Sequence, residues 1–145
     1  ITFYALKPVK GTIFEHGNGP KTEDYLWWIA KTRINFPKLE IIAGTTARRY
    51  EEVGSLLKAW ANAFTKFPAT KMFGTKEAFK IEEDIKSVNR KLKGTITKLP
   101  DLDWNKEVEL LELNEELENE VKEKLEIYLK RIKANYSKTM ENNIN

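Results

Sequence analysis

The sequence predicts an α/β protein with a parallel sheet, because three short, β-prone apolar segments alternate with three amphipathic helical segments. The predicted strands are residues 1–6, 39–43 and 61–67, and a Pro or Gly follows each of them. The helical segments are about 12–18 residues long, a length that lets a right-handed crossover return the chain to a parallel neighbour. We therefore expect about three parallel strands with crossover helices, followed by a long C-terminal amphipathic helix.

The first strand carries a nearly continuous apolar run, Ile1 to Leu6, interrupted only by Thr2. Such a run is typical of a strand that is covered on both faces. Because it starts at full hydrophobicity at residue 1, we expect it to be an internal strand whose preceding units lie elsewhere. The Pro8–Gly11 segment then predicts a loop leading to the first helix.

The helical segments begin and end at ordinary helix signals. The first is expected to start at Thr22, which is predicted to cap it, and to stop before Pro37. The second covers residues 47–59, and the third starts at Thr75 and ends before Gly94. We expect these helices and the three strands to form one α/β region over residues 1–101.

The C-terminal region has a different pattern. Apolar residues recur at three- and four-residue steps among many Glu and Lys, which predicts one long amphipathic helix over residues 102–136. Its apolar stripe needs a surface to cover. Residues 137–145 are polar, and we expect them to form a flexible tail.

Composition excludes several classes of function. The net charge of +3 comes from 25 basic and 22 acidic residues that are interleaved, so no nucleic-acid partner is expected. The chain has no cysteine, which excludes disulfides and thiolate metal sites formed by this chain alone. No apolar run approaches the ~20 residues of a membrane span. We expect a cytoplasmic protein without a membrane partner, and the Lys/Glu-rich, Cys-free composition is typical of thermophiles.

Ligands of parallel α/β proteins bind at the carboxyl ends of the strands, which directs attention to residues 7–12, 44–49 and 66–71. All three segments combine Lys or Arg with Gly or Thr, a combination that can hold an anion at a helix N-terminus. The alternative is that the Gly and Thr are turn and cap residues and the cations are solvated. Neither phosphate-loop spacing is present. The only histidine, His16, lies in a Gly/Asn loop without companions for catalysis or metal binding.

Two further positions are unusual. Glu40 is a charge inside a short apolar strand, where it shares a face with Ile42. It either points into a barrel lumen and meets substrate, or lies at a rim with its carboxylate in water. Trp60 stands between a predicted helix and strand, where a Gly is expected.

Four segments, in this order and spacing, carry a resemblance to a known family: KPVKGT (7–12), TRINFP (32–37), LEIIAG (39–44) and LLKAWANAFTKF (56–67). Together they resemble the C-terminal part of biotin-synthase-like radical S-adenosylmethionine enzymes, over residues 1–101. The resemblance implies a partial (β/α) barrel of about three parallel strands, made of the last three β/α units of the family's barrel. It also implies reductive cleavage of S-adenosylmethionine by a 4Fe–4S cluster.

The resemblance assigns binding roles but no catalytic residue. It implies that S-adenosylmethionine contacts Leu6, Lys7, Pro8 and Val9, and that substrate contacts Tyr4, Glu40 and Lys66. Glu40 stands where biotin synthases have a cluster-binding Arg, and Tyr4 where they have an Asn, so a different substrate is expected. Trp60 replaces the family's Gly.

The family's cluster-binding cysteines are not in this chain. On this interpretation a missing N-terminal half or a partner chain supplies the 4Fe–4S cluster, and the isolated chain is inactive. The alternative is a non-enzymatic α/β interaction module that self-associates into a homo-oligomer through its sheet edges and the C-terminal helix.

Overall fold

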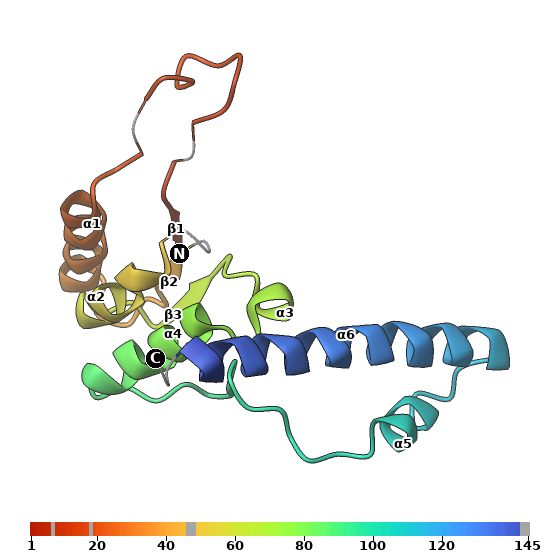
Figure 1. Cartoon of the computed structure of the whole chain (residues 1–145). Helices are drawn as coiled ribbons and strands as arrows, with labels where there is room; N and C mark the ends of the chain where they lie inside the picture. Colours follow the sequence, from red (N-terminus) through yellow and green to blue (C-terminus); the bar gives the residue numbers. More distant parts are fainter. Residues whose placement is uncertain (7, 18, 46–48, 143–145) are drawn as a thin grey trace.

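The computed structural model describes residues 1–6, 8–17, 19–45 and 49–142. A three-stranded sheet and its helices form the N-terminal part, and a helical arm follows (Figure 1). In chain order the elements are β1 (Thr2–Tyr4), α1 (Thr22–Asn35), β2 (Ile42–Gly44), the 3-10 helix η1 (Tyr50–Glu52), α2 (Val53–Lys58), β3 (Ala63–Thr65), α3 (Ala69–Met72), α4 (Lys76–Ser87), α5 (Trp104–Glu109) and α6 (Glu115–Asn142).

The predicted parallel sheet is confirmed. Its strand order is β1-β2-β3, and both pairings are parallel. Tyr4 is level with Gly44, and Gly44 is level with Thr65. Consecutive strands are therefore neighbours, joined by helical crossovers.

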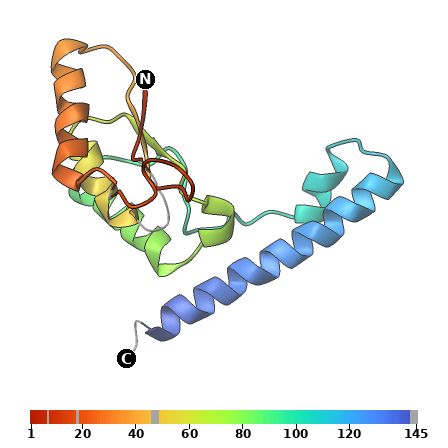
Figure 2. The ribbon, with the colours of Figure 1, turned by 90° about the horizontal axis from the view of Figure 1, so that it is seen from above.

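One face of the sheet packs against helices α1, α2 and α4, which lie side by side (Figure 2). The fully buried side chains come from each of these layers and include Ile29 of α1, Leu56 of α2 and Ile81 of α4. Ala43, in the middle of β2, is also fully buried. Because side chains alternate along a strand, Tyr4, Gly44 and Thr65 lie on the other face.

The prediction that the first strand is covered on both faces is wrong for this structure. Ile1, Tyr4 and Leu6 are 55%, 58% and 48% exposed, whereas Phe3 packs against the core. The apolar run suggested two covered faces, but the described helices cover only one. The open face thus exposes the ring of Tyr4.

Helix α1 begins at Thr22 and ends before Pro37, as predicted, but its N-terminus is held differently. The Thr22 hydroxyl does not cap the helix and instead donates a hydrogen bond to Glu52, from a distant part of the chain. Helix α4 is shorter than the predicted segment, because Val88 ends it and Asn89 takes a left-handed conformation (φ 56°).

The C-terminal region forms two helices where the sequence predicted one. The chain turns after α5, with Glu112 in a left-handed conformation (φ 51°), and Asn114 then starts α6 by accepting a hydrogen bond from the Leu117 backbone N–H at 2.9 Å. Helix α6 continues through Asn142, so most of the predicted flexible tail is helical. The i,i+4 ion pairs along α6 are consistent with this length.

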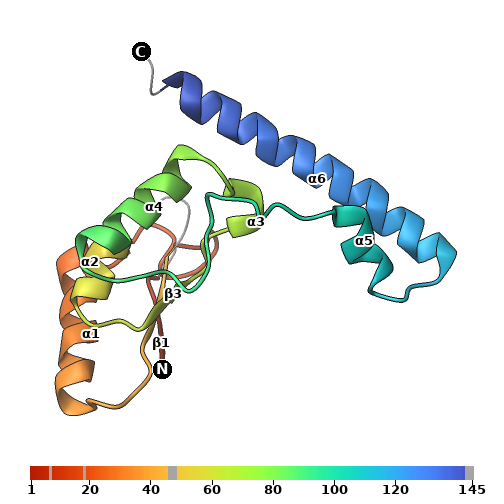
Figure 3. The ribbon, with the colours of Figure 1, turned by 90° about the horizontal axis from the view of Figure 1, so that it is seen from below.

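The C-terminal half of α6 is anchored next to α4. The Asn135 amide donates to the Phe73 carbonyl at 2.9 Å, the Thr139 hydroxyl donates to the Gly74 carbonyl at 3.2 Å, and the ring of Tyr136 lies against Gly74. The other half of α6 and α5 extend away from the sheet as an arm (Figure 3). Within the described residues, no helix combines the length and apolar character needed to cross a membrane.

Candidate functional site

The candidate site lies at the carboxyl end of the sheet, on the face that the helices leave open. Tyr4, Gly44 and Thr65 form one row across the three strands. Lys66 follows β3 directly. This is the place where parallel α/β folds bind ligands.

Tyr4 and Lys66 are brought together. The Lys66 ammonium lies 5.5 Å from the centre of the Tyr4 ring, within the range of a cation–π contact. Lys66 has a left-handed backbone (φ 68°), which costs a non-glycine residue about 1–2 kcal/mol. A long, charged side chain is thus held over an aromatic ring at the expense of backbone strain, and such strain is frequent at binding sites.

The ring of Tyr4 lies directly against the backbone of Gly44. A Cβ at this position would collide with the Tyr4 ring and would lie 2.9 Å from the Phe3 carbonyl oxygen. Glycine is therefore the residue that lets the ring lie flat across the neighbouring strand. The exposed ring offers a flat apolar surface and Lys66 offers a positive charge, so the pair can hold a ligand with an apolar or cationic part and an anionic group.

Tyr25 holds the first two strands together below this site. Its hydroxyl lies 2.8 Å from the Phe3 carbonyl oxygen and 2.9 Å from that of Gly44, so its one proton is shared between a carbonyl of β1 and a carbonyl of β2. Burial raises the pKa of Tyr25 above its usual 10.0, outweighing the opposite effects of the Gly44 hydrogen bond and the Arg49 charge. The hydroxyl therefore stays protonated at neutral pH.

Arg49 was one of the cations expected to hold an anion, and the structure shows that Glu52 already pairs with it. The guanidinium donates to both carboxylate oxygens, at 2.6 and 2.7 Å, and also stacks 5.7 Å from the Tyr25 ring centre. Thr45, at the end of β2, donates its hydroxyl to the Arg49 carbonyl at 2.8 Å. These contacts make Arg49 a positioning residue of the loop after β2. Thr46 and Arg48 lie outside the described residues.

The residues expected to contact S-adenosylmethionine lie in the loop after β1. Leu6 and Val9 are about half exposed, Pro8 is half-buried, and Lys7 lies outside the described residues. This loop extends from the carboxyl end of the sheet (Figure 1). His16 is exposed in the same loop.

Glu40 is not brought to Tyr4 and Lys66. Tyr4 is level with Gly44, four residues after Glu40, which corresponds to about 13 Å along a strand. Glu40 is exposed near the amino end of β2, and its carbonyl accepts a hydrogen bond from the backbone nitrogen of Ile1 at 2.7 Å. Glu40 thus lies at the amino end of the sheet with its side chain exposed, away from Tyr4 and Lys66.

The residues of this chain do not fit an iron–sulfur cluster. The chain has no cysteine, and among the described residues no three His, Cys, Asp or Glu side chains form a group that would hold a metal ion. Any thiolate ligands would have to come from outside residues 1–145.

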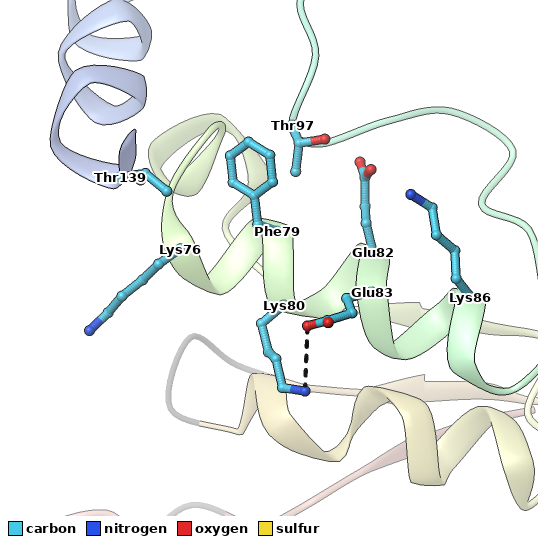
Figure 4. A pocket seen from close by; sticks show the side chains of 8 residues that line it. All are labelled: Lys76, Phe79, Lys80, Glu82, Glu83, Lys86, Thr97 and Thr139. Carbon is cyan, nitrogen blue, oxygen red and sulfur yellow. Dashed lines mark ion pairs between the residues drawn. The ribbon is translucent and has the colours of Figure 1, made fainter. Parts of the chain in front are cut away.

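Sequence reasoning missed a hollow of about 490 Å³ between α4, the segment around Thr97 and the end of α6 (Figure 4). Lys76, Lys80 and Lys86 line it together with two glutamates, Glu82 and Glu83. Glu82 accepts hydrogen bonds from the Thr95 hydroxyl and the Ile96 N–H, both at 2.7 Å, so it anchors the segment after α4. Lys80 pairs with Glu83 at 3.8 Å and with Asp84 at 2.6 Å, so several of these charges already have partners. No sequence motif links the segments.

The fold and this site define an α/β protein with sequential parallel strands and a site at their carboxyl ends. No family model matches the chain, and no solved structure matches it significantly. It is similar to the uncharacterized protein MJ0597 of Methanocaldococcus jannaschii, with 37% identity over 146 aligned residues. The match covers 91% of this chain but 41% of the relative, so the chain spans about two fifths of the relative's length.

Proposed function

We propose that this chain forms three consecutive β/α units of a β/α-barrel enzyme and binds part of its ligand at the carboxyl ends of β1, β2 and β3. The observation that carries the proposal is the sequential strand order with α1, α2 and α4 on one face. Doubly wound sheets carry helices on both faces, whereas barrel units place all of them on the outside. The open face with Tyr4 and Lys66 then corresponds to the barrel interior.

The longer relative supports this assignment. This chain matches 41% of it, which leaves enough sequence for further β/α units. Within the described residues, β1 and β3 each pair only with β2, so each has a free edge that a further strand would fill.

The resemblance to radical S-adenosylmethionine enzymes related to biotin synthase suggests the ligand. On this proposal S-adenosylmethionine lies against the loop after β1, at Leu6, Pro8 and Val9. The substrate lies against Tyr4 and Lys66, and its anionic group, such as a carboxylate, pairs with the Lys66 ammonium. Glu40 is left out because of its distance from this pair.

The proposal gives this chain a binding role and no redox step. The class of enzyme uses a 4Fe–4S cluster, which needs thiolates that this chain does not have. Orientation of the two ligands is what Tyr4, Lys66 and the loop after β1 would contribute.

The test is an NMR titration of the isotope-labelled 145-residue chain with S-adenosylmethionine, up to about 1 mM, the concentration range of weak binding. We expect chemical-shift changes in residues 4–9, 44–45 and 65–66. No change at these residues, or changes confined to the hollow beside α4, would refute the ligand assignment.

A parallel titration with a small carboxylate tests the role of Lys66. We expect Lys66→Gln to weaken this binding about tenfold, because a charge-assisted hydrogen bond contributes about 1.5 kcal/mol or more. The matched control is Lys98→Gln, since Lys98 is an exposed lysine outside the site. Equal binding by the two variants would rule out Lys66 as the anion-binding group.

A further inference from the structure

Three adjoining hollows lie near the amino end of the sheet, with volumes of about 550, 480 and 290 Å³. Pro37 lines the first two, and Asn62 and Arg90 line the last two, so the three hollows adjoin one another along one surface. We call this surface the basic groove. It is lined by five cationic side chains and no acidic one: Arg33, Lys38, Arg90, Lys91 and Lys93.

The basic groove is also apolar. Ile34, Phe36 and Trp60 line it and are 76%, 59% and 62% exposed. The guanidinium of Arg90 stacks on the Trp60 ring at 5.4 Å. A patch of exposed large apolar side chains bordered by charges of one sign is typical of a surface that binds another protein segment.

The helical arm has the complementary composition. Residues 107–120 contain seven Glu and four Leu but no Lys or Arg. Leu110, Leu111 and Leu117 are 74%, 58% and 43% exposed. Lys122 pairs with two of the glutamates, Glu109 and Glu118. We call residues 107–120 the acidic arm.

The acidic arm cannot reach the basic groove of its own chain as the fold stands. Figures 1 and 3 show α5 and the start of α6 at one end of the molecule, and the end of α4, next to the groove, at the other. The C-terminal half of α6 is fixed to the α3–α4 segment through Asn135 and Thr139, which keeps the arm directed outward. A contact between arm and groove is therefore intermolecular.

We propose that the acidic arm of one copy of this chain docks in the basic groove of a second copy, and that two such contacts form a closed two-fold dimer. The exposed leucines would cover Ile34, Phe36 and Trp60, while the surrounding glutamates pair with the groove lysines. Charge complementarity between these two surfaces favours a second copy over another partner. A reciprocal exchange closes the assembly, whereas a one-way contact would propagate into a filament.

The test is sedimentation of the full chain at concentrations of about 1–100 μM, with variants that reverse charge on each surface. The groove variant is Lys38→Glu with Lys91→Glu and Lys93→Glu, three exposed lysines. The arm variant is Glu112→Lys with Glu115→Lys and Glu116→Lys, three exposed glutamates. We expect each triple variant to raise the dimer Kd about tenfold or more.

Combining both triple changes in one chain restores opposite charges, so we expect the Kd to return towards that of the unchanged protein. The control is Lys10→Glu with Lys71→Glu and Lys133→Glu, which changes the same number of exposed lysines elsewhere and should leave the Kd unaltered. Circular dichroism shows whether each variant is folded.

A monomer at all concentrations would overturn the proposal, as would a dimer that both triple variants leave intact or a combined variant that is not rescued. The NMR titration of the carboxyl-end site gives an independent result, because the basic groove lies near the opposite end of the sheet. Failure of self-association and failure of ligand binding are thus distinguishable.

Discussion

The hydroxyl oxygen of Tyr25 lies 2.9 Å from the carbonyl oxygen of Gly44, which joins helix α1 to the end of the central strand. The same hydroxyl lies 2.8 Å from the Phe3 carbonyl oxygen. One buried side chain therefore fixes two strands at the level of the candidate site. Its position also makes it a sensitive probe of that end of the fold.

We expect Tyr25→Phe to lower the free energy of unfolding by about 1–2 kcal/mol at neutral pH. The ring and its contact with Arg49 remain, while the Phe3 and Gly44 carbonyl oxygens lose the buried hydrogen bond from the hydroxyl. Urea denaturation measures the change. Tyr128→Phe is the control, since the Tyr128 hydroxyl has no partner among the described residues, and an equal loss in both variants would contradict this explanation.

The advantage of the unchanged protein over Tyr25→Phe should shrink at alkaline pH. Burial raises the pKa of Tyr25 above 10.0, so the folded state retains the hydroxyl proton when the unfolded state has begun to lose it. The stabilisation by the Tyr25 hydroxyl is complete at pH values below the pKa of Tyr25 in the unfolded state. It is lost as pH rises through about 10 towards the pKa in the folded state. Unfolding curves of both proteins between about pH 8 and 11 test this, and a constant difference would refute it.

For Glu82 we expect the opposite pH dependence: its contribution to the free energy of unfolding is lost at acidic pH. Burial alone would raise its pKa, but hydrogen bonds from Thr95 and Ile96 lower it below its usual 4.5. The stabilisation by the Glu82 carboxylate is therefore present at pH values above its pKa in the unfolded state. It is lost as pH falls through its pKa in the folded state. We expect Glu82→Gln to cost about 1 kcal/mol at pH 7 and progressively less below pH 4.5.

Glu83→Gln is the matched control for Glu82, because Glu83 is on the same helix with a side chain that is 76% exposed. We expect it to change the free energy of unfolding by less than about 0.5 kcal/mol. If the two variants had the same pH profile, the hydrogen bonds to the segment after α4 would not be the cause.

The parallel sheet could be predicted because its signals are local. Pro8 and Pro68 lie a few residues after β1 and β3, Gly44 is the last residue of β2, and the helical segments between the strands have the length of crossovers. The exposure of Tyr4 could not be predicted in this way. An apolar run has the same sequence whether both faces of a strand are covered or only one.

The candidate site was predicted in part. Position after a strand pointed to the segment that contains Lys66, and the resemblance assigned both Tyr4 and Lys66 to the substrate; the structure brings these two side chains together. Tyr25 and Glu52 were missed because each acts through a contact about 20–30 residues away along the chain, to Gly44 and Thr22 respectively. No sequence spacing marks a side chain that bonds to a distant carbonyl.

Trp60 gives a prediction about the backbone. It has a left-handed conformation (φ 76°) and follows Ala59, the residue that caps the end of α2. Its N–H donates to the Leu57 carbonyl and the Ala61 N–H donates to that of Leu56, both at 3.1 Å, which is the hydrogen-bond pattern of a Schellman helix end. This geometry explains why a Gly was expected at this position.

We expect Trp60→Gly to be more stable than Trp60→Ala by about 1 kcal/mol, because both remove the indole but only Gly adopts the left-handed conformation without strain. Thermal unfolding of the two variants measures the difference. Lys58 provides the control, since it is in the last turn of α2 and there Gly should be less stable than Ala by about 0.5–1 kcal/mol. The same preference at both positions would show that the conformation of Trp60 does not determine the stability of this helix end.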